Sequence, residues 1–203
     1  PMDNSAFTST NVKPLKYGVA IRITKEMMED GKFNLLARHV ALTAKRLAEN
    51  ENSLVVTQLD SAANTVSGGA AVTIANLTRA MQYLEDSDYQ PTTLCVGMEV
   101  ANDLRNIDTF AEADKRGSTE MQMTGFLGNI YGMNVYKVST NAGMTTTSSY
   151  VFDKAHAYCI VEKRPVTLEN FKLPLFDSEG AAITQRIAVK VLRTSAVAKV
   201  TSS

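Results

Sequence analysis

The sequence has no excess of charge of either sign. Its 203 residues include 21 Lys and Arg and 21 Asp and Glu, so the formal net charge is zero. A protein that binds nucleic acid through its phosphates normally shows a basic excess, so we expect any contact with DNA to be weak or local. No apolar run approaches the roughly 18 residues of a membrane-spanning helix, and the chain begins with polar residues, unlike a signal peptide. We therefore expect no membrane association.

Cysteine and histidine are scarce, which limits metal and redox chemistry. Cys95 and Cys159 each lie inside an apolar run, where free buried thiols of a reducing compartment are favoured over a disulfide or a metal pair. His39 has no second ligand three or four residues away, and His156 lies between two alanines. Both patterns favour a structural histidine. A pocket with a strongly perturbed histidine or carboxylate near either one would instead favour an enzyme.

The motifs that carry common chemistries are absent. There is no H-x-x-x-H, C-x-x-C, calcium-loop or G-x-S-x-G pattern, and Gly68-Gly69 lacks the lysine of a phosphate cradle. Glu26, Glu29 and Asp30 crowd together, but carboxylates near helix ends are usually solvated. We therefore predict no catalytic residue, no metal and no cofactor, and a chain that is not an enzyme.

The longest unbroken helical pattern runs over residues 33–50, FNLLARHVALTAKRLAEN. It lacks Gly and Pro and is rich in strong helix formers. Leu36, Val40, Ala44 and Leu47 recur at spacings of three and four, so they should share one face. Burying three large apolar side chains gives roughly 5–8 kcal/mol at about 1.5–3 kcal/mol each. That suffices to dock a helix on a sheet but not to form a core, so we predict a strut in a larger fold.

Around this helix the chain reads as α+β, with helices early and strands late. In the first half we predict a strand over 17–24 and then a helical turn over 25–29 capped by Thr24. After the long helix we predict a helical or extended piece over 53–59 and a loop over 60–71. A helix over 74–85, a strand over 93–96 and a helix over 98–106 should follow. In the second half we predict a loop over 108–124, strands over 133–138, 150–152 and 156–161, and an end to that run at 164–165, with residues 166–168 as a candidate restart. A loop over 169–179 and long alternating strands over 182–191 and 192–200 should follow.

The order of these pieces resembles a known family. The run KYGVAIRITKEMMEDGKFNLLARHVALTAKRLAENENSLVVTQL is similar to the strand, turn and spine helix of tailed-phage major capsid proteins, whose Hong Kong ninety-seven type fold is shared with encapsulins. TIANLTRAMQYLED and TTLCVGMEVANDLRN resemble the axial-domain helix, strand and helix. GFLGNIYGMNVYKVSTNAG, YVFDKAHAYCIVEKRPVTLEN and AAITQRIAVKVLRTSAVAKV resemble the glycine signature and the return strands. The resemblance covers about residues 16–200.

The resemblance implies a shell protein with two domains. Residues 1–72 and 150–203 would form a peripheral domain, in which the spine helix packs on a sheet, and residues 73–149 would form an axial domain with a mixed sheet flanked by helices. Copies would join into pentamers and hexamers and meet at threefold contacts. The residues implied near those contacts, on what we read as a charged loop, are Glu162, Lys163, Arg164, Glu169, Asn170 and Phe171. An ordinary solvated hairpin is the alternative for that loop.

The implied function is the major capsid protein of a tailed phage or prophage head enclosing double-stranded DNA. Its partners would be copies of itself, with scaffold, portal and decoration proteins as further candidates. It would be assembled in the host cytoplasm and reside in the virion. The family usually has an N-terminal arm and an extended loop before the spine strand, and only about fifteen residues precede it here, which suggests a trimmed chain or a member without them. An encapsulin-like compartment and an uncharacterised α+β enzyme are the alternatives.

Overall fold

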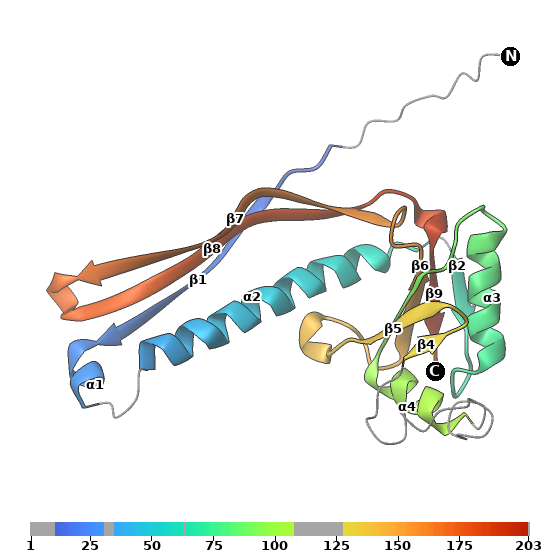
Figure 1. Ribbon diagram of the computed structural model, residues 1–203, viewed down its shortest axis with the longest axis horizontal. Coiled ribbons are helices and arrows are strands. Elements are labelled where there is room, and N and C mark those ends of the chain that lie inside the picture. Colours follow the sequence, from blue (N-terminus) through green and yellow to red (C-terminus); the bar gives the residue numbers. More distant parts are fainter. Residues whose placement is uncertain (1–10, 31–34, 63, 108–127, 203) are drawn as a thin grey trace, which may run out of the picture. The chain divides into compact units, whose positions relative to one another are not determined.

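Each half of the molecule is built from segments far apart in the sequence. The computed structural model describes residues 11–30, 35–62, 64–107 and 128–202. The chain divides into unit 1, residues 1–47 and 160–189, and unit 2, residues 48–159 and 190–203 (Figure 1). The predicted domain limits at 72/73 and 149/150 stay a prediction from family likeness.

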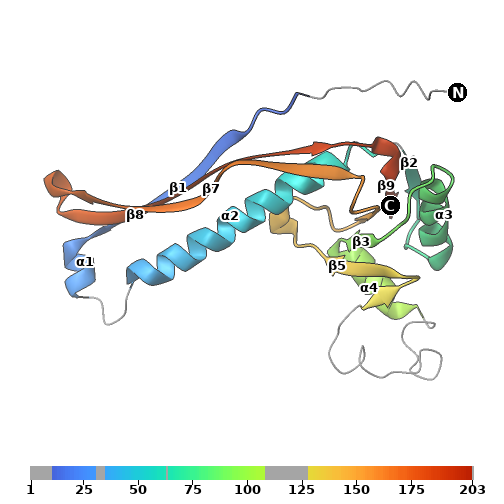
Figure 2. The ribbon, with the colours of Figure 1, turned by 45° about the horizontal axis from the view of Figure 1, so that its top comes forward.

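Unit 1 contains a three-stranded sheet with strand order β1-β8-β7. β1 (Leu15–Thr24) pairs antiparallel with the central strand β8 (Ser178–Val191), and β7 (Tyr158–Leu173) is the outer strand on the other side. Buried residues alternate along β8 because successive side chains point to opposite faces. These residues are Ala181, Ile183, Gln185 and Ile187. The first half of α2 (Leu35–Leu59) runs along this sheet (Figures 1 and 2).

The turn after β1 forms as predicted. α1 (Lys25–Glu29) follows the strand directly, and the Thr24 hydroxyl accepts a hydrogen bond from the Met27 N–H at 3.4 Å. A threonine in extended conformation satisfies one of the free N–H groups that a helix start leaves. None of the α1 residues is buried.

The spine helix α2 is longer than predicted, and its inward face differs from the predicted one at a single position. The sequence predicted an end at Asn50, but the helix continues to Leu59, so the 53–59 piece is helical; residues 33 and 34 lie outside the described part. Leu47 is buried as predicted, whereas Ala44 is exposed and Thr43 is buried in its place. The Thr43 hydroxyl donates to the His39 carbonyl at 2.8 Å, so its burial leaves no unpaired polar group.

Unit 2 is organised around a six-stranded mixed sheet in the order β2-β9-β6-β3-β5-β4. The strands are β2 (Asn64–Ser67), β3 (Thr93–Val96), β4 (Asn129–Ile130), β5 (Met133–Lys137), β6 (Ser148–Phe152) and β9 (Val197–Thr201). Every residue of β6 is buried. Its Val151 packs in one apolar cluster, and its Tyr150 and Phe152 pack in another. The sheet therefore has its own core on both faces.

The helices of unit 2 are the predicted ones. α3 (Ile74–Glu85) and α4 (Met98–Asn106) have the predicted bounds and contribute Leu77, Leu84 and Leu104 to the first cluster. The end of α2 contributes Val56 and Leu59 to the second. The predicted loop over 108–124 lies outside the described residues.

Several late predictions are wrong. β7 runs unbroken past Pro165 to Leu173, where the sequence predicted an end and then a loop over 169–179. A proline is tolerated because β7 is an outer strand, whose outward N–H groups need no ladder partner. β8 ends at Val191, and after a 3₁₀ turn (Thr194–Ala196) β9 joins the six-stranded sheet, so residues 192–200 do not extend one strand. The predicted loop over 60–71 contains β2, which pairs with β9.

The glycine-rich stretch makes the tight turn expected of it. β4 and β5 form a hairpin in which Ile130 pairs with Met133. The two residues between them, Tyr131 and Gly132, have φ of 48° and 81°. Positive φ at both central positions is typical of the type I′ turn that suits a two-residue hairpin.

Candidate functional site

The six predicted interface residues all lie on β7. The structure places them on an extended strand of the β7–β8 hairpin, which corrects the charged loop and agrees with the hairpin alternative. Their place at threefold contacts stays a prediction. Five of them are exposed. Phe171 is half-buried, and its ring covers Gly180 on β8, where an added Cβ would lie 2.5 Å from the ring atom Cζ. Phe171 therefore has a structural role in the sheet, whatever it contacts outside it.

Two of the six, Lys163 and Arg164, meet cations from the other two strands. They line a cavity of about 460 Å³ together with Lys16 of β1 and Arg186 of β8. Lys16 and Arg186 are direct register partners. One guanidinium nitrogen of Arg186, Nη2, donates to the Pro14 carbonyl at 3.3 Å, while its buried Nε has no acceptor among the described residues. All four residues that line this cavity are positively charged, and we call them the basic cluster.

The β7–β8 hairpin ends in an exposed apolar tip that the sequence analysis missed. The 3₁₀ turn Pro174–Phe176 presents Leu175, 95% exposed, and Phe176, 62% exposed. Arg22 lies over the Phe176 ring at 5.2 Å from its centroid, and Lys25 forms an ion pair with Asp177. The signal that could have found this tip is the L-P-L-F run between charged residues, which is unusual for a solvated loop.

In unit 2 a polar network fastens the end of α2 to the sheet. The Tyr150 hydroxyl donates to Asp60, and the Lys199 ammonium lies 2.7 Å from the same carboxylate oxygen. Burial opposes ionisation of Asp60, but the hydrogen bonds from Lys199 and Tyr150 hold its pKa below the ordinary value. Burial, and then the bond to Asp60, raise the pKa of Tyr150. The network is structural, because it joins the end of α2 to β6 and β9.

His156 is also held in a structural role. Its Nδ1 lies 2.7 Å from Asp153 Oδ2, and the Asp153 Oδ1 accepts from the Ala155 N–H at 2.9 Å, which closes a tight turn. Burial opposes ionisation of Asp153, but the bonds from His156 and Ala155 keep its pKa below the usual range. A shallow cavity nearby is lined by Asp153 and Thr92. The Thr92 hydroxyl bonds the Phe152 carbonyl at 3.4 Å, and among the described residues no hydroxyl or thiol pairs with His156, so no activated nucleophile is assembled.

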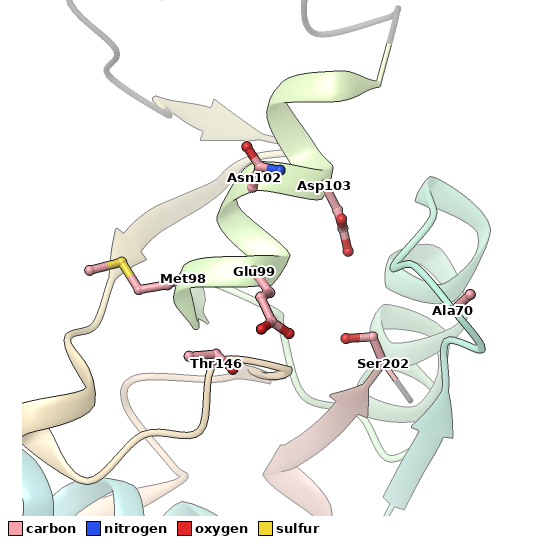
Figure 3. Close-up of a pocket in the computed structure, with 7 residues that line it drawn as sticks. All are labelled: Ala70, Met98, Glu99, Asn102, Asp103, Thr146 and Ser202. Carbon is pink, nitrogen blue, oxygen red and sulfur yellow. The ribbon is translucent and has the colours of Figure 1, made fainter.

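A third cavity, of about 560 Å³, lies beside α4. Figure 3 shows Glu99 and Asp103 on one side of the helix, Ser202 across the cavity from them, and Thr146 on the loop at the start of the helix. Asp103 accepts from the Val72 N–H at 3.1 Å, and the Ser202 hydroxyl donates to the Thr147 carbonyl at 3.2 Å. These groups brace the local backbone. Within the described ranges, no group of three or more His, Cys, Asp or Glu side chains is arranged to hold a metal ion.

The two cysteines are free, as predicted, although both are only partly buried. Burial raises the pKa of the Cys95 thiol to about 11. None of the helices in the described part of the chain has the length and apolarity needed to cross a bilayer.

Comparison with known proteins supplies the context for these surfaces. A family model described as "Phage capsid protein" matches residues 7–200. No curated protein sequence matches the chain. Among solved structures, the chain is similar to one from Mycobacterium phage Che8, with a TM-score of 0.81 and 18% identity over 98% of this chain and 76% of that one.

Two further structures extend the comparison. One is from Microbacterium phage Oxtober96, with a TM-score of 0.76 and 14% identity over 100% of this chain and 77% of that one. The other is a virus-like particle from Pyrococcus furiosus, with a TM-score of 0.68 and 13% identity over 92% and 76%. At these identities the structures show the fold, and with the family model they confirm the resemblance and the fold class drawn from the sequence.

Proposed function

The chain belongs to the phage capsid protein family, and on that premise we propose that copies of it tile the icosahedral head of a tailed bacteriophage or prophage. The copies join into pentamers and hexamers that enclose double-stranded DNA. The subunit is structural and not an enzyme, and it resides in the virion after assembly in the host cytoplasm. Scaffold, portal and decoration proteins are its further candidate partners.

This proposal rests mainly on the exposure of β7 in the single chain. This outer strand is 16 residues long, and none of its residues is buried. Ile160, Val166 and Leu168 each expose more than half of their surface. A long outer strand with exposed apolar side chains is a site of association unless another chain covers it. In a shell, neighbouring copies would supply that cover.

We further propose that unit 2 corresponds to the axial domain and unit 1 to the peripheral domain. Unit 2 has its own apolar clusters on both faces of its sheet, which suits a wedge that packs around a capsomer axis. Unit 1 offers five exposed residues of β7, which suit contacts between capsomers: Glu162, Lys163, Arg164, Glu169 and Asn170. Zero net charge is consistent with a wall that contacts packaged DNA weakly and non-specifically.

A protein compartment of the encapsulin type is the second candidate. The likeness to the virus-like particle from Pyrococcus furiosus shows that the same fold occurs there. The match to the phage capsid family model over residues 7–200 favours the phage head.

The test is to express the full-length protein, alone and with candidate scaffold, and to examine the products by electron microscopy and sedimentation velocity. We expect closed particles of megadalton mass. A protein that stays monomeric under every assembly condition would contradict the proposal. The contents of particles isolated from infected or induced cells separate the two candidates, since a head holds double-stranded DNA and a compartment holds protein.

A further inference from the structure

The basic cluster of unit 1 lacks an anionic partner within the described part of the chain. Lys16 and Arg186 face each other across the β1–β8 ladder, an arrangement in which like charges repel. Lys163 and Arg164 of β7 add two more cations to the same cavity. Glu162 is adjacent in sequence but does not line the cavity, and no ion pair involving any of the four cations occurs among the described residues. The free subunit therefore holds four cations around a space that a carboxylate could enter.

An excess of the opposite sign occurs at the other end of β1. The turn that follows the strand carries Glu26, Glu29 and Asp30, all exposed. The single cation of α1, Lys25, is already in an ion pair with Asp177. Nothing in the described residues forms an ion pair with the three carboxylates, so the acidic turn projects unpaired negative charge.

The two groups of charge cannot meet within one subunit. Lys16 and Thr24 are both in β1, eight residues apart on an extended strand, so about 26 Å of sheet separates them. Figure 1 shows α1 at the far end of β1 from the start of the strand. Complementary charges at opposite ends of one rigid sheet favour a head-to-tail contact between copies, which is heterologous and can close into rings or a lattice.

We propose that the basic cluster of Lys16, Lys163, Arg164 and Arg186 binds the acidic turn of Glu26, Glu29 and Asp30 from a second copy of this chain. This inference rests on the proposed function and names one of its contacts. Two arginines in the cluster suit paired carboxylates, which a guanidinium binds through two parallel hydrogen bonds. The phosphates of a nucleic acid are the other anions that such a cluster could take. The copy is favoured because the chain carries a matching unpaired acidic group and no overall basic excess.

The experiment exchanges the charges. One variant carries Lys163→Glu and Arg164→Glu, and a second carries Glu26→Lys and Glu29→Lys. Each alone should lower particle yield at least about tenfold, because like charges then face each other across the contact. An equimolar mixture of the two should restore co-assembly, since each altered surface then meets its altered complement on the other chain. Lys45→Glu and Glu85→Lys, both at exposed helical positions, are the matched controls and should assemble normally.

The outcomes separate this contact from the proposed function. Circular dichroism and thermal melting should show that every variant folds, and raising the salt concentration should weaken assembly of the wild type. If the wild type assembles but the mixture does not, the charge contact is wrong while the shell function stands. If the first variant assembles normally but its particles lose nucleic acid, the cluster binds phosphate and the contact is again wrong. A wild type that never assembles overturns both.

Discussion

Among the described glycines of unit 1, Gly180 has the least room for a side chain. It lies in the central strand β8 opposite Arg22 of β1. A Cβ at this position would lie 2.2 Å from the Ile21 carbonyl oxygen and 2.5 Å from Cζ of Phe171. The glycine therefore lets the neighbouring strand and the ring of Phe171 approach closely. We predict that Gly180→Ala opens the three-stranded sheet.

The size of the effect follows from the geometry of the ladder. A carbon and a carbonyl oxygen approach to about 3.3 Å at closest, so β1 and β8 would have to separate locally by about 1 Å. Ladder hydrogen bonds would then lengthen from about 2.9 Å to about 3.9 Å, past the limit of a hydrogen bond. Losing about two of them costs roughly 1–3 kcal/mol, and displacing the Phe171 ring adds about 1–3 kcal/mol of overpacking. The total is about 2–6 kcal/mol, a large part of the roughly 5–15 kcal/mol that holds a domain folded.

Hydrogen exchange read by mass spectrometry on the unassembled chain is the assay. We expect faster exchange in β1 and β8, unchanged exchange in β6 and β9, and a lower particle yield. Gly18→Ala is the matched control on the facing strand. Its Cβ would meet the Thr184 methyl at 2.9 Å and the Ile183 carbonyl oxygen at 3.0 Å, a milder conflict that a side-chain rotation relieves in part. Equal protection losses in the two variants, or a larger loss in Gly18→Ala, would refute the steric reasoning.

Three further predictions test the tip, the network and the thiol. Replacing both Leu175 and Phe176 with serine should leave the melting temperature of the free subunit nearly unchanged, because both side chains are largely exposed, but should reduce particle yield in electron microscopy if the tip is covered on assembly. The folded state holds the pKa of Asp60 below its ordinary value of 3.8. The ionised carboxylate therefore stabilises the fold fully above about pH 3.8, and this stabilisation is lost as the pH falls through the pKa of Asp60 in the folded state. The urea midpoints of the wild type and Asp60→Asn should therefore converge in acid, and a gap that stays constant would contradict the assignment. With a pKa of about 11, Cys95 should resist iodoacetamide at about pH 8 in the folded chain and react in urea, which mass spectrometry of the labelled peptide reports.

The stretch from α3 to α4 was predictable from sequence to the residue. α3, β3 and α4 all have the predicted bounds. In the sequence, a threonine precedes α3, a regular apolar stripe runs along α3, and a glycine precedes α4. At Gly97, an added Cβ would lie 2.4 Å from the Thr145 and Thr146 carbonyl oxygens. Local signals suffice here because local and tertiary preferences agree.

Elsewhere tertiary pairing overrides the local signal. Pro165 predicted the end of a strand, but β7 continues because the proline lies on an outer strand. The asparagines at 50 and 52 predicted a helix end, yet α2 continues to Leu59, whose burial with Val56 in the second apolar cluster stabilises the last turns. β2 was predicted as loop because its pairing partner β9 is more than 100 residues away in the sequence. No local window contains such information.

The candidate functional surfaces also divide into residues that the sequence identified and residues that only the fold brings together. The sequence identified Lys163 and Arg164 through a family resemblance, but only the fold brings them together with Lys16 and Arg186. The hairpin tip was missed because β7 was predicted to stop before it. Residue spacing along the sequence cannot predict a cluster built from three strands, because the register between the strands decides which side chains meet.

The contrast between the two sheets indicates where this subunit depends on its neighbours. In unit 2, the chain covers both faces of the central strand β6, all of whose residues are buried. The outer strand β7 of the other sheet includes no buried residue, and the four cations of the basic cluster form no ion pair within the described part of the chain. An exposed strand of this kind makes a free subunit prone to association, so it would be retained only where association is the function. The buried strand β6 should therefore keep its hydrogen-exchange protection unchanged on assembly, while β7 and the residues around Lys16 and α1 should gain protection in the particle. Equal gains in β6 and β7 would contradict this division.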